Sequence, residues 1–166
     1  MSIPALMLRK EMFSARRFAD PDVPFPWLMP SADAEPFDEP GNIEVPAPGA
    51  GDTAILTFRC PVGFQGLLLG HQHQYFGTGF IQGSGGLLWR IAIDGNFPRG
   101  LGAMPFEMGA LQQNRPLFAP VRFVENQEIV YSVNVPALSP VATGAGNYTI
   151  AAVAGWLYPM ESRRTR

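Results

Sequence analysis

The chain has 166 residues, enough for one domain with a hydrophobic core, and it carries a formal net charge of −2 with a sequence pI of about 5.6. This balance does not indicate a nucleic-acid-binding protein, and no apolar run approaches the length of about 18 residues that a membrane span needs. The single cysteine, Cys60, rules out a disulfide within the chain, and the first residues do not have the pattern of a secretory signal peptide.

Glycine and proline are abundant, whereas charged residues are few. The chain holds 18 Gly and 17 Pro, and only 16% of its residues are charged, against about 25% in typical domains. Its only lysine is Lys10. Long helices rich in Ala, Glu and Lys are therefore not expected. Many short strands joined by Gly/Pro turns are expected instead.

Residues 1–19 predict one short helix, over about residues 5–18, on which polar and apolar side chains mix. Basic side chains gather here, at Arg9, Lys10, Arg16 and Arg17, and again in "RRTR" at the basic C-terminal tail, 161–166. Such ends can contact nucleic acid or an acidic protein surface, or simply aid solubility. Because the rest of the chain is nearly neutral, we do not expect nucleic acid to be a partner.

Residues 20–50 form an acidic, proline-rich segment without a basic residue. Proline fixes φ and removes a backbone donor, so the segment predicts an extended arm that is neither a helix nor the interior of a sheet. Its large apolar side chains are unusual for a disordered linker. Together with the basic residues before it, residues 1–50 predict an N-terminal arm, either mobile or laid along its own domain or a neighbour. The candidates for partner contact are Phe25, Trp27, Leu28, Met29, Phe37, Arg9, Arg16 and Arg17.

Residues 51–160 predict the globular domain. Turn sequences such as "GSGG" and "TGAGN" separate segments that alternate between apolar and polar residues, as strands with one buried face do. An irregular strand near 103–109 is expected as well. Short antiparallel strands in this number favour an all-β sandwich, with a jelly roll as the expected topology. The regular strands are expected at 53–60, 65–75, 87–94, 117–124, 128–135 and 147–157, and the core is expected to include Trp89, Ile91, Val133 and Trp156.

The predicted domain has few charged side chains. Between Arg59 and Met160 the charged residues are Arg59, Arg90, Arg99, Arg115, Arg122, Asp94, Glu107, Glu125 and Glu128. An isolated soluble monomer usually carries more. The pattern favours a domain that neighbouring molecules cover, as a homo-oligomer (a trimer or dimer) or as part of a larger assembly.

The stretch "GHQHQYFGTG" contains the only two histidines, His71 and His73. On a strand, positions i and i+2 face the same side, so the two imidazoles could share a metal ion, as the H-x-H of a cupin does. A cupin-type site also needs a nearby Glu and a third His, and a catalytic zinc takes three protein ligands. We therefore predict no metal and no cofactor. We interpret His71, His73, Tyr75 and Phe76 as residues of a subunit interface, with a degenerate cupin-type metal protein as an alternative.

Other candidate sites have weaker support in the sequence. Cys60 has no nearby base that would activate it, so an inert thiol is expected. The glycine run "GTGFIQGSGG" precedes a strand rather than a helix, which argues against a phosphate cradle. Exposed aromatic residues could form a glycan-binding platform, a second class of function. Its candidates are Tyr75, Phe76, Phe80 and Trp89. No combination of residues indicates catalysis, so we do not expect an enzyme.

Three short motifs carry a resemblance to a known family. They are P-x-G-x-x-G at Pro61–Gly66, W-x-I-x-x-D-G at Trp89–Gly95, and G-W-x-x-P at Gly155–Pro159. Together they resemble small β-sandwich virion structural proteins of tailed bacteriophages. The resemblance implies a non-enzymatic place in the virion, as a capsid cement or decoration protein that contacts the major capsid protein, or as a component near the head–neck or portal. It implies no catalytic residues.

Overall fold

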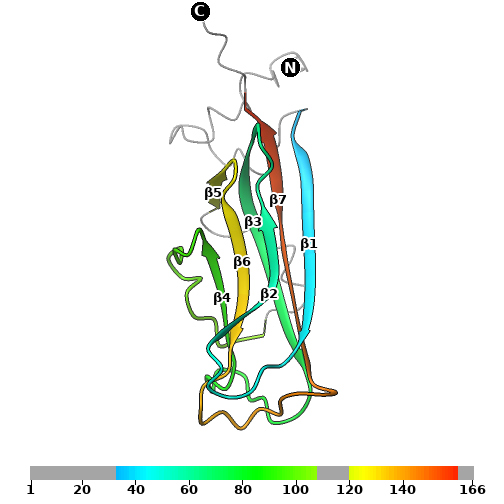
Figure 1. The fold of residues 1–166 in the computed structure, drawn as a ribbon, viewed down its shortest axis with the longest axis vertical. Helices are drawn as coiled ribbons and strands as arrows, with labels where there is room; N and C mark the ends of the chain where they lie inside the picture. The colour runs from blue at the N-terminus through cyan, green and yellow to red at the C-terminus, as the bar shows by residue number, and fades with distance from the viewer. Residues whose placement is uncertain (1–32, 108–119, 161–166) are drawn as a thin grey trace, which may run out of the picture.

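The computed structural model describes residues 33–107 and 120–160, which contain strands but no helix (Figure 1). Among these residues no helix is long and apolar enough to cross a membrane. The helix expected at 5–18, the basic tail at 161–166, and the candidates from Arg9 to Met29 lie outside the described residues. The strands are β1 (Glu35–Glu44), β2 (Asp52–Arg59), β3 (Phe64–Phe76), β4 (Leu88–Ile93), β5 (Val121–Val124), β6 (Glu128–Asn134) and β7 (Tyr148–Pro159).

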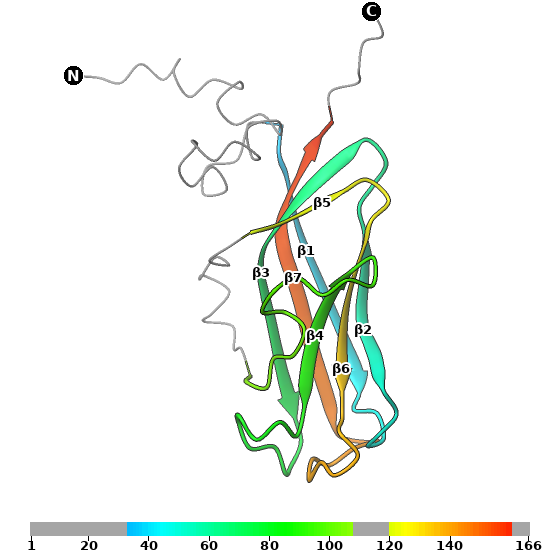
Figure 2. The ribbon, with the colours of Figure 1, turned by 90° about the vertical axis from the view of Figure 1, so that its left-hand side faces the viewer.

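The strands form two antiparallel sheets packed face to face, which confirms the predicted all-β sandwich (Figure 2). Sheet A has the order β1-β7-β3-β5, and sheet B has the order β2-β6-β4. Every step along the chain from one strand to the next changes sheet. This alternation and order match a jelly roll, whose full form has about eight strands in two Greek keys.

The place of the eighth strand, beside β4, is taken by the segment around Met104. The Trp89 N–H donates to the Met104 carbonyl (3.1 Å), and the Met104 N–H donates to the Trp89 carbonyl (2.9 Å). The Ile91 N–H donates to the Leu101 carbonyl (2.9 Å). Of the irregular strand expected near 103–109, the described part is a single bridge at Met104, and residues 108–109 lie outside the described residues.

Strand β1 changes the expected domain boundary. The segment 35–44 was expected to belong to an arm, yet it pairs with β7 along its whole length, from Glu35 opposite Leu157 to Glu44 opposite Tyr148. The folded domain therefore begins by Glu35 rather than at residue 51. As expected for a proline-bearing strand, β1 lies at a sheet edge.

The parity of β1 explains how it tolerates proline. The Val45 N–H donates to the Asn147 carbonyl on the β7 side, so odd-numbered residues direct their backbone groups toward β7. Pro36 and Pro40, which lack a donor, then face the open edge, where no ladder bond is lost. Prolines at an edge also hinder unwanted strand pairing.

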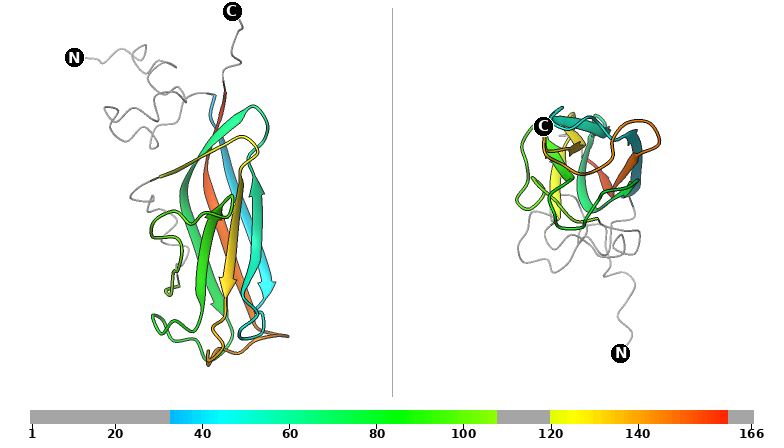
Figure 3. Two further views of the ribbon diagram at one scale, coloured as in Figure 1. Left: turned by 60° about the vertical axis from the view of Figure 1, so that its left-hand side comes forward. Right: turned by 90° about the horizontal axis from the view of Figure 1, so that it is seen from below.

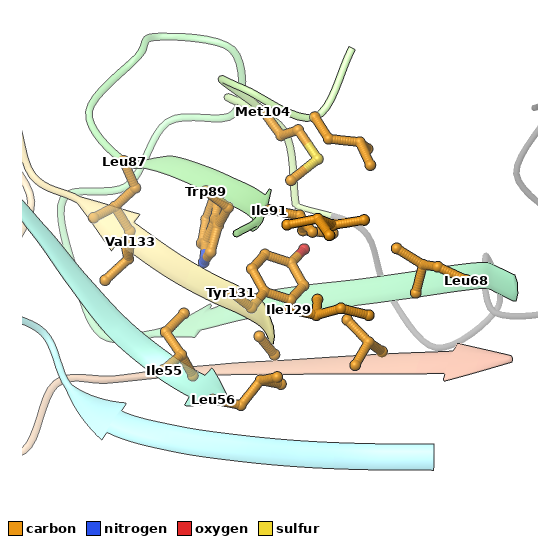
Figure 4. Packing of buried hydrophobic residues seen from close by; sticks show 14 of the residues in the cluster. Ile55, Leu56, Leu68, Leu87, Trp89, Ile91, Met104, Ile129, Tyr131 and Val133 are labelled. Carbon is orange, nitrogen blue, oxygen red and sulfur yellow. The ribbon is translucent and has the colours of Figure 1, made fainter. Parts of the chain in front are cut away.

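The core lies between the two sheets, where apolar side chains from both inner faces meet (Figure 4). Trp89, Ile91 and Val133, which the sequence places in the core, are fully buried there. Trp156 is different: it is half-buried and lies opposite Leu67 on the face of sheet A that points away from sheet B. The expectation that Trp156 belongs to the core is therefore wrong, because on β7 the inward residues are the odd-numbered ones, such as Val153.

The regular strands agree with the sequence except at two places. The strands expected at 53–60, 65–75, 87–94, 128–135 and 147–157 appear within two residues of those bounds. The strand expected at 117–124 appears as β5, and residues 117–119 lie outside the described residues. The second difference is β1, which the sequence did not predict as a strand.

Candidate functional site

A β-bulge in β3 turns both histidines into the core. Before the bulge, even-numbered residues such as Leu68 face sheet B; the pairing with β7 then shifts between Leu68 and Gly70. After it, the odd-numbered His71 and His73 are the inward residues, and both are buried. Bulges commonly redirect side chains in this way. As predicted, His71 and His73 lie on the same face of their strand, but that face points into the core.

The two imidazoles meet Tyr131 of β6 between the sheets. His71 Nδ1 lies 3.2 Å from the Tyr131 hydroxyl, and His73 Nδ1 is hydrogen-bonded to the same hydroxyl. His73 Nε2 is hydrogen-bonded to the Phe106 carbonyl. All three side chains are buried. The cluster therefore connects β3, β6 and the segment that follows Met104.

The carbonyl of Phe106 sets the direction of these hydrogen bonds when both imidazoles are neutral. A carbonyl only accepts, so His73 Nε2 carries the proton and Nδ1 is left as an acceptor. The Tyr131 hydroxyl then donates to His73 Nδ1 and accepts from His71 Nδ1–H. The result is an ordered chain from His71 through Tyr131 and His73 to Phe106.

Aromatic packing fixes the same rings. The His73 ring stacks on Trp89, with ring centroids 4.3 Å apart and planes 20° from parallel. The Trp89 indole N–H donates to Thr149 Oγ1 (2.9 Å), which in turn donates to the Gln74 carbonyl (3.1 Å). Every buried polar group named here thus has a partner, which is the condition for keeping such groups inside a core.

Burial lowers the pKa of both histidines. The pKa of His71 falls from its usual 6.5 to about 4 because the protonated ring is desolvated. For His73 the pKa falls to about 3, again chiefly by burial; the bond to the Phe106 carbonyl raises it, and the neighbouring His71 lowers it. Both rings are therefore neutral at pH 7. Burial also raises the pKa of Tyr131 well above its usual value, which keeps the phenol protonated.

This cluster is organised for structure rather than for chemistry. His73 uses both ring nitrogens for protein groups, so neither is free to bind a metal ion. Within residues 33–107 and 120–160, no group of three or more His, Cys, Asp or Glu is placed to hold a metal. The cluster also corrects the expected subunit interface: His71, His73 and Tyr75 are buried in their own domain, and Phe76 alone of the four is exposed.

The aromatic residues proposed for glycan binding do not form a platform. Trp89 and Tyr75 are buried, and Phe80 is half-buried against Trp89, with ring centroids 5.6 Å apart. The hydroxyl of Tyr75 lies within hydrogen-bond distance of the carbonyls of Thr78 (2.8 Å) and Ala142 (3.0 Å), which share its single proton. Tyr75 therefore contacts the loops 77–87 and 135–147 from the interior of the domain. Phe76 alone of these four is open to a ligand.

Cys60 lies at the end of β2 and is buried. Its thiol donates to the Phe64 carbonyl (3.4 Å). Burial, with a smaller contribution from the charge of Glu125, raises the pKa of the Cys60 thiol to about 11. A thiol of this kind is a poor nucleophile at neutral pH.

A second feature is an uncharged end of the sandwich, which we call the loop end. It consists of the loops 45–51, 77–87 and 135–147, which gather at one end of the molecule (Figures 1 and 3). None of their residues is charged. Charged side chains nevertheless lie beside this end. Glu107 accepts a hydrogen bond from the Tyr75 backbone N–H (3.0 Å), and Glu44 accepts one from the Tyr148 hydroxyl (3.5 Å).

The loop end is well ordered by hydrogen bonds between its three loops. Gly144 N–H donates to the Val45 carbonyl (2.9 Å), Ala142 N–H donates to the Thr78 carbonyl (2.9 Å), and the Ser139 hydroxyl donates to the Gly86 carbonyl (2.5 Å). Gly79, at a φ of 84°, packs so closely on the Pro140 carbonyl that a Cβ would lie 2.3 Å from its oxygen. These contacts fix the loops relative to one another.

Large apolar side chains project from this fixed end. Leu138 is 97% exposed and Ile81 is 65% exposed. Phe76 and Tyr148, paired across β3 and β7 beside the loops, are also exposed. The sequence predicted a domain poor in charge but did not locate this surface. The sequence does contain a pattern that could have located it, since three Gly/Pro-rich turn segments contain no charged residue.

The comparisons with known proteins do not place the chain in a family. No family model matches the sequence, and a search of characterised proteins finds no significant match. The fold and the loop end are therefore the basis for a functional proposal.

Proposed function

We propose that the protein is a non-enzymatic structural component of a virion, acting as a cement or decoration protein that binds across neighbouring subunits of a capsid. The loop end is the observation that carries the proposal. It presents exposed apolar side chains on loops held by hydrogen bonds, without a charge among them. Exposed apolar patches of this kind are typical of protein–protein contact sites.

The preformed loops favour binding to another protein. Because the loops 77–87 and 135–147 are already linked by hydrogen bonds, little conformational entropy would be lost when they bind. On a capsid surface the same contact repeats many times, so each one can be modest in area. The motifs that resemble tailed-phage virion proteins support this assembly over others, and a position at the head–neck or portal is the alternative within it.

Two charge substitutions at the loop end test the proposal. Ile81→Asp combined with Leu138→Asp introduces charge at the two most exposed large apolar side chains of the loop end, where it would have to be desolvated on binding. We expect binding to preassembled shells of the major capsid protein to weaken by about 100-fold, measured by co-sedimentation.

The matched control is Val62→Asp, at the opposite end of the sandwich, where Val62 is 73% exposed. It adds the same kind of charge to an equally open site, and we expect the binding to be unchanged. Equal loss in both variants would show that the loop end has no special role. Full binding by the Ile81/Leu138 variant would refute the proposal.

The N-terminal segment is the second proposed contact. A chain that begins at Asp33 keeps β1 intact and removes the residues that precede it. If those residues clamp a neighbouring subunit, this shortened chain should bind the shells more weakly while unfolding at the same denaturant concentration. Binding equal to that of the full chain would exclude a clamp.

A further inference from the structure

One side of the sandwich, between β3 and β4, is closed by a loop segment. β5 pairs with β3 only from Gln65 to Leu68, and no other strand of residues 33–107 and 120–160 pairs with that side of β3. Residues 101–107, which we call the closing segment, follow β4 and lie between it and the second half of β3 (Figure 2). Three backbone hydrogen bonds, made by Leu101 and Met104, hold the closing segment to β4. The side chains of both residues belong to the core.

Side chains, rather than a ladder of backbone hydrogen bonds, join the closing segment to β3. His73 Nε2 donates to the Phe106 carbonyl, and the Glu107 carboxylate accepts a hydrogen bond from the Tyr75 N–H (3.0 Å). Among the described residues, no bond between two backbone groups links the closing segment with β3. The His73 ring also stacks on Trp89 of β4. His73 is therefore the buried contact at which β3, β4 and the closing segment meet.

A proton added to His73 would disturb this contact. The proton goes to Nδ1, so the Tyr131 hydroxyl loses the acceptor of its hydrogen bond, and a cation then lies between the two sheets. The titratable side chains in contact with His73 are His71 on β3 and Tyr131 on β6, and neither supplies a negative charge at neutral or acidic pH. The carboxylate at the closing segment, Glu107, is bonded to the Tyr75 N–H instead. The closed structure therefore does not stabilise a protonated His73.

We propose that His73 is an acid-sensitive switch for the closing segment, which opens when His73 takes up a proton while the two sheets stay folded. The closing segment is the least firmly held neighbour of His73. β6 is paired on both sides, and β3 is paired with β7 along its whole length. Segments with few backbone hydrogen bonds open at the lowest cost in free energy. Opening would hydrate the imidazolium and uncover Leu101 and Met104. This device belongs to the isolated protein and does not rest on the virion role.

Amide hydrogen exchange of the full chain at pH 7 and pH 5 tests the proposal. The reporters are the N–H groups of Trp89, Ile91 and Met104, which join β4 to the closing segment. A histidine with a pKa of about 3 when buried and 6.5 when exposed makes the open form about 20-fold more populated at pH 5 than at pH 7. Protection of the three amides, corrected for the intrinsic exchange rate at each pH, should fall by that factor. Urea below the unfolding transition should barely change their exchange but should accelerate exchange in β7.

The decisive variant is His73→Gln, which keeps a donor for the Phe106 carbonyl and an acceptor for the Tyr131 hydroxyl but takes up no proton. Its three reporter amides should be equally protected at pH 7 and pH 5.

Two matched controls, His71→Gln and Glu107→Gln, remove the other groups that can titrate at this contact, and each should keep the fall of about 20-fold. A pH response that survives in His73→Gln, or that disappears in either control, overturns the role of His73. The same urea dependence in the reporter amides and in β7 overturns local opening. If His73→Gln does not fold, the two controls still decide, because they test the other titratable groups one at a time.

Discussion

At the scale of single residues, Tyr131 joins two histidines that are far from it in sequence. Its hydroxyl contacts Nδ1 of both His71 and His73, and the Phe106 carbonyl holds the far nitrogen of His73. A proton added to His71 goes to Nε2 and leaves these hydrogen bonds in place, whereas a proton added to His73 goes to Nδ1 and requires the Tyr131 hydroxyl to stop donating there. Either proton puts a cation in the core, and both together would put two cations next to each other. The cluster therefore links the stability of the fold to pH.

The stability of the protein should fall between pH 7 and pH 5. Both histidines have a folded-state pKa, about 4 and about 3, below the unfolded value of 6.5, so the unfolded chain binds more protons in this range. The free energy of unfolding then decreases as the pH falls below 6.5 and levels off only near the folded-state pKa values. At pH 5 the loss is about 2 kcal/mol for each histidine, or roughly 4 kcal/mol in total. Urea unfolding at both pH values measures it.

The control for this prediction removes one of the two titrating groups. His71→Gln keeps a polar side chain at the end of the hydrogen-bond chain, and the loss between pH 7 and pH 5 should fall to about 2 kcal/mol. A stability that does not change with pH in the unsubstituted protein would show that the histidines are not held neutral by burial.

Sequence reasoning predicted part of this site. The shared strand face of His71 and His73 follows from their spacing, and the absence of a bound metal stays a prediction. The bulge after Leu68 was not predictable, because it depends on pairing with β7. Tyr131 was not predictable as the partner either, since the contact joins strands of different sheets and residues 58 and 60 positions apart.

At the scale of strands, β1 shows why an edge element escapes detection. Of its ten residues, the inward side chains of Phe37 and Ile43 are apolar, whereas Glu35 and Glu39 at the same parity are charged and exposed. Gly41 lies against the backbone of β2, a close approach that only the folded structure shows: a Cβ there would lie 2.5 Å from the Ile55 carbonyl oxygen. Pro36 and Pro40 then suggest an extended arm. The sequence alone does not show that their backbone groups face the open edge of a sheet, where proline is tolerated.

Phe37 is the main anchor of β1, although the sequence suggested it as a contact for a partner. Its ring stacks on Phe58 (4.7 Å between centroids, 8° between planes) and meets the edge of Phe123 at 5.7 Å. Phe37→Ala removes this contact between the sheets and should lower the free energy of unfolding by about 2–4 kcal/mol. Chemical denaturation measures the change.

Pro36→Ala is the matched control on the same strand. Pro36 is exposed and directs its backbone toward the open edge, so its replacement should change stability by less than about 0.5 kcal/mol. If Phe37→Ala had as small an effect as Pro36→Ala, β1 would not be a stable part of the sandwich in solution, and residues 33–50 would again be best described as an arm.

At the scale of the whole molecule, the loops at the two ends of the sandwich differ in charge. The loops 45–51, 77–87 and 135–147 are uncharged, whereas Glu125 and Asp94 lie at the opposite end. Next to the loop end, Arg90 and Asp52 form an ion pair (2.8 Å), and two further carboxylates, those of Glu44 and Glu107, accept hydrogen bonds from the Tyr148 hydroxyl and the Tyr75 N–H. The other contacts proposed for the chain, Arg9, Arg16 and Arg17, are basic.

This difference makes the salt dependence of binding informative. If the loop end supplies most of the affinity for the capsid shell, raising NaCl from about 0.05 to 0.5 M should change the dissociation constant by less than about threefold, because apolar contacts are not screened by salt. If the basic residues supply it, binding should weaken by tenfold or more over the same range. Titration of the full chain onto shells at several salt concentrations distinguishes the two. The Ile81→Asp/Leu138→Asp variant provides the internal check: any binding that it retains should come from the basic segment and should therefore be the salt-sensitive part.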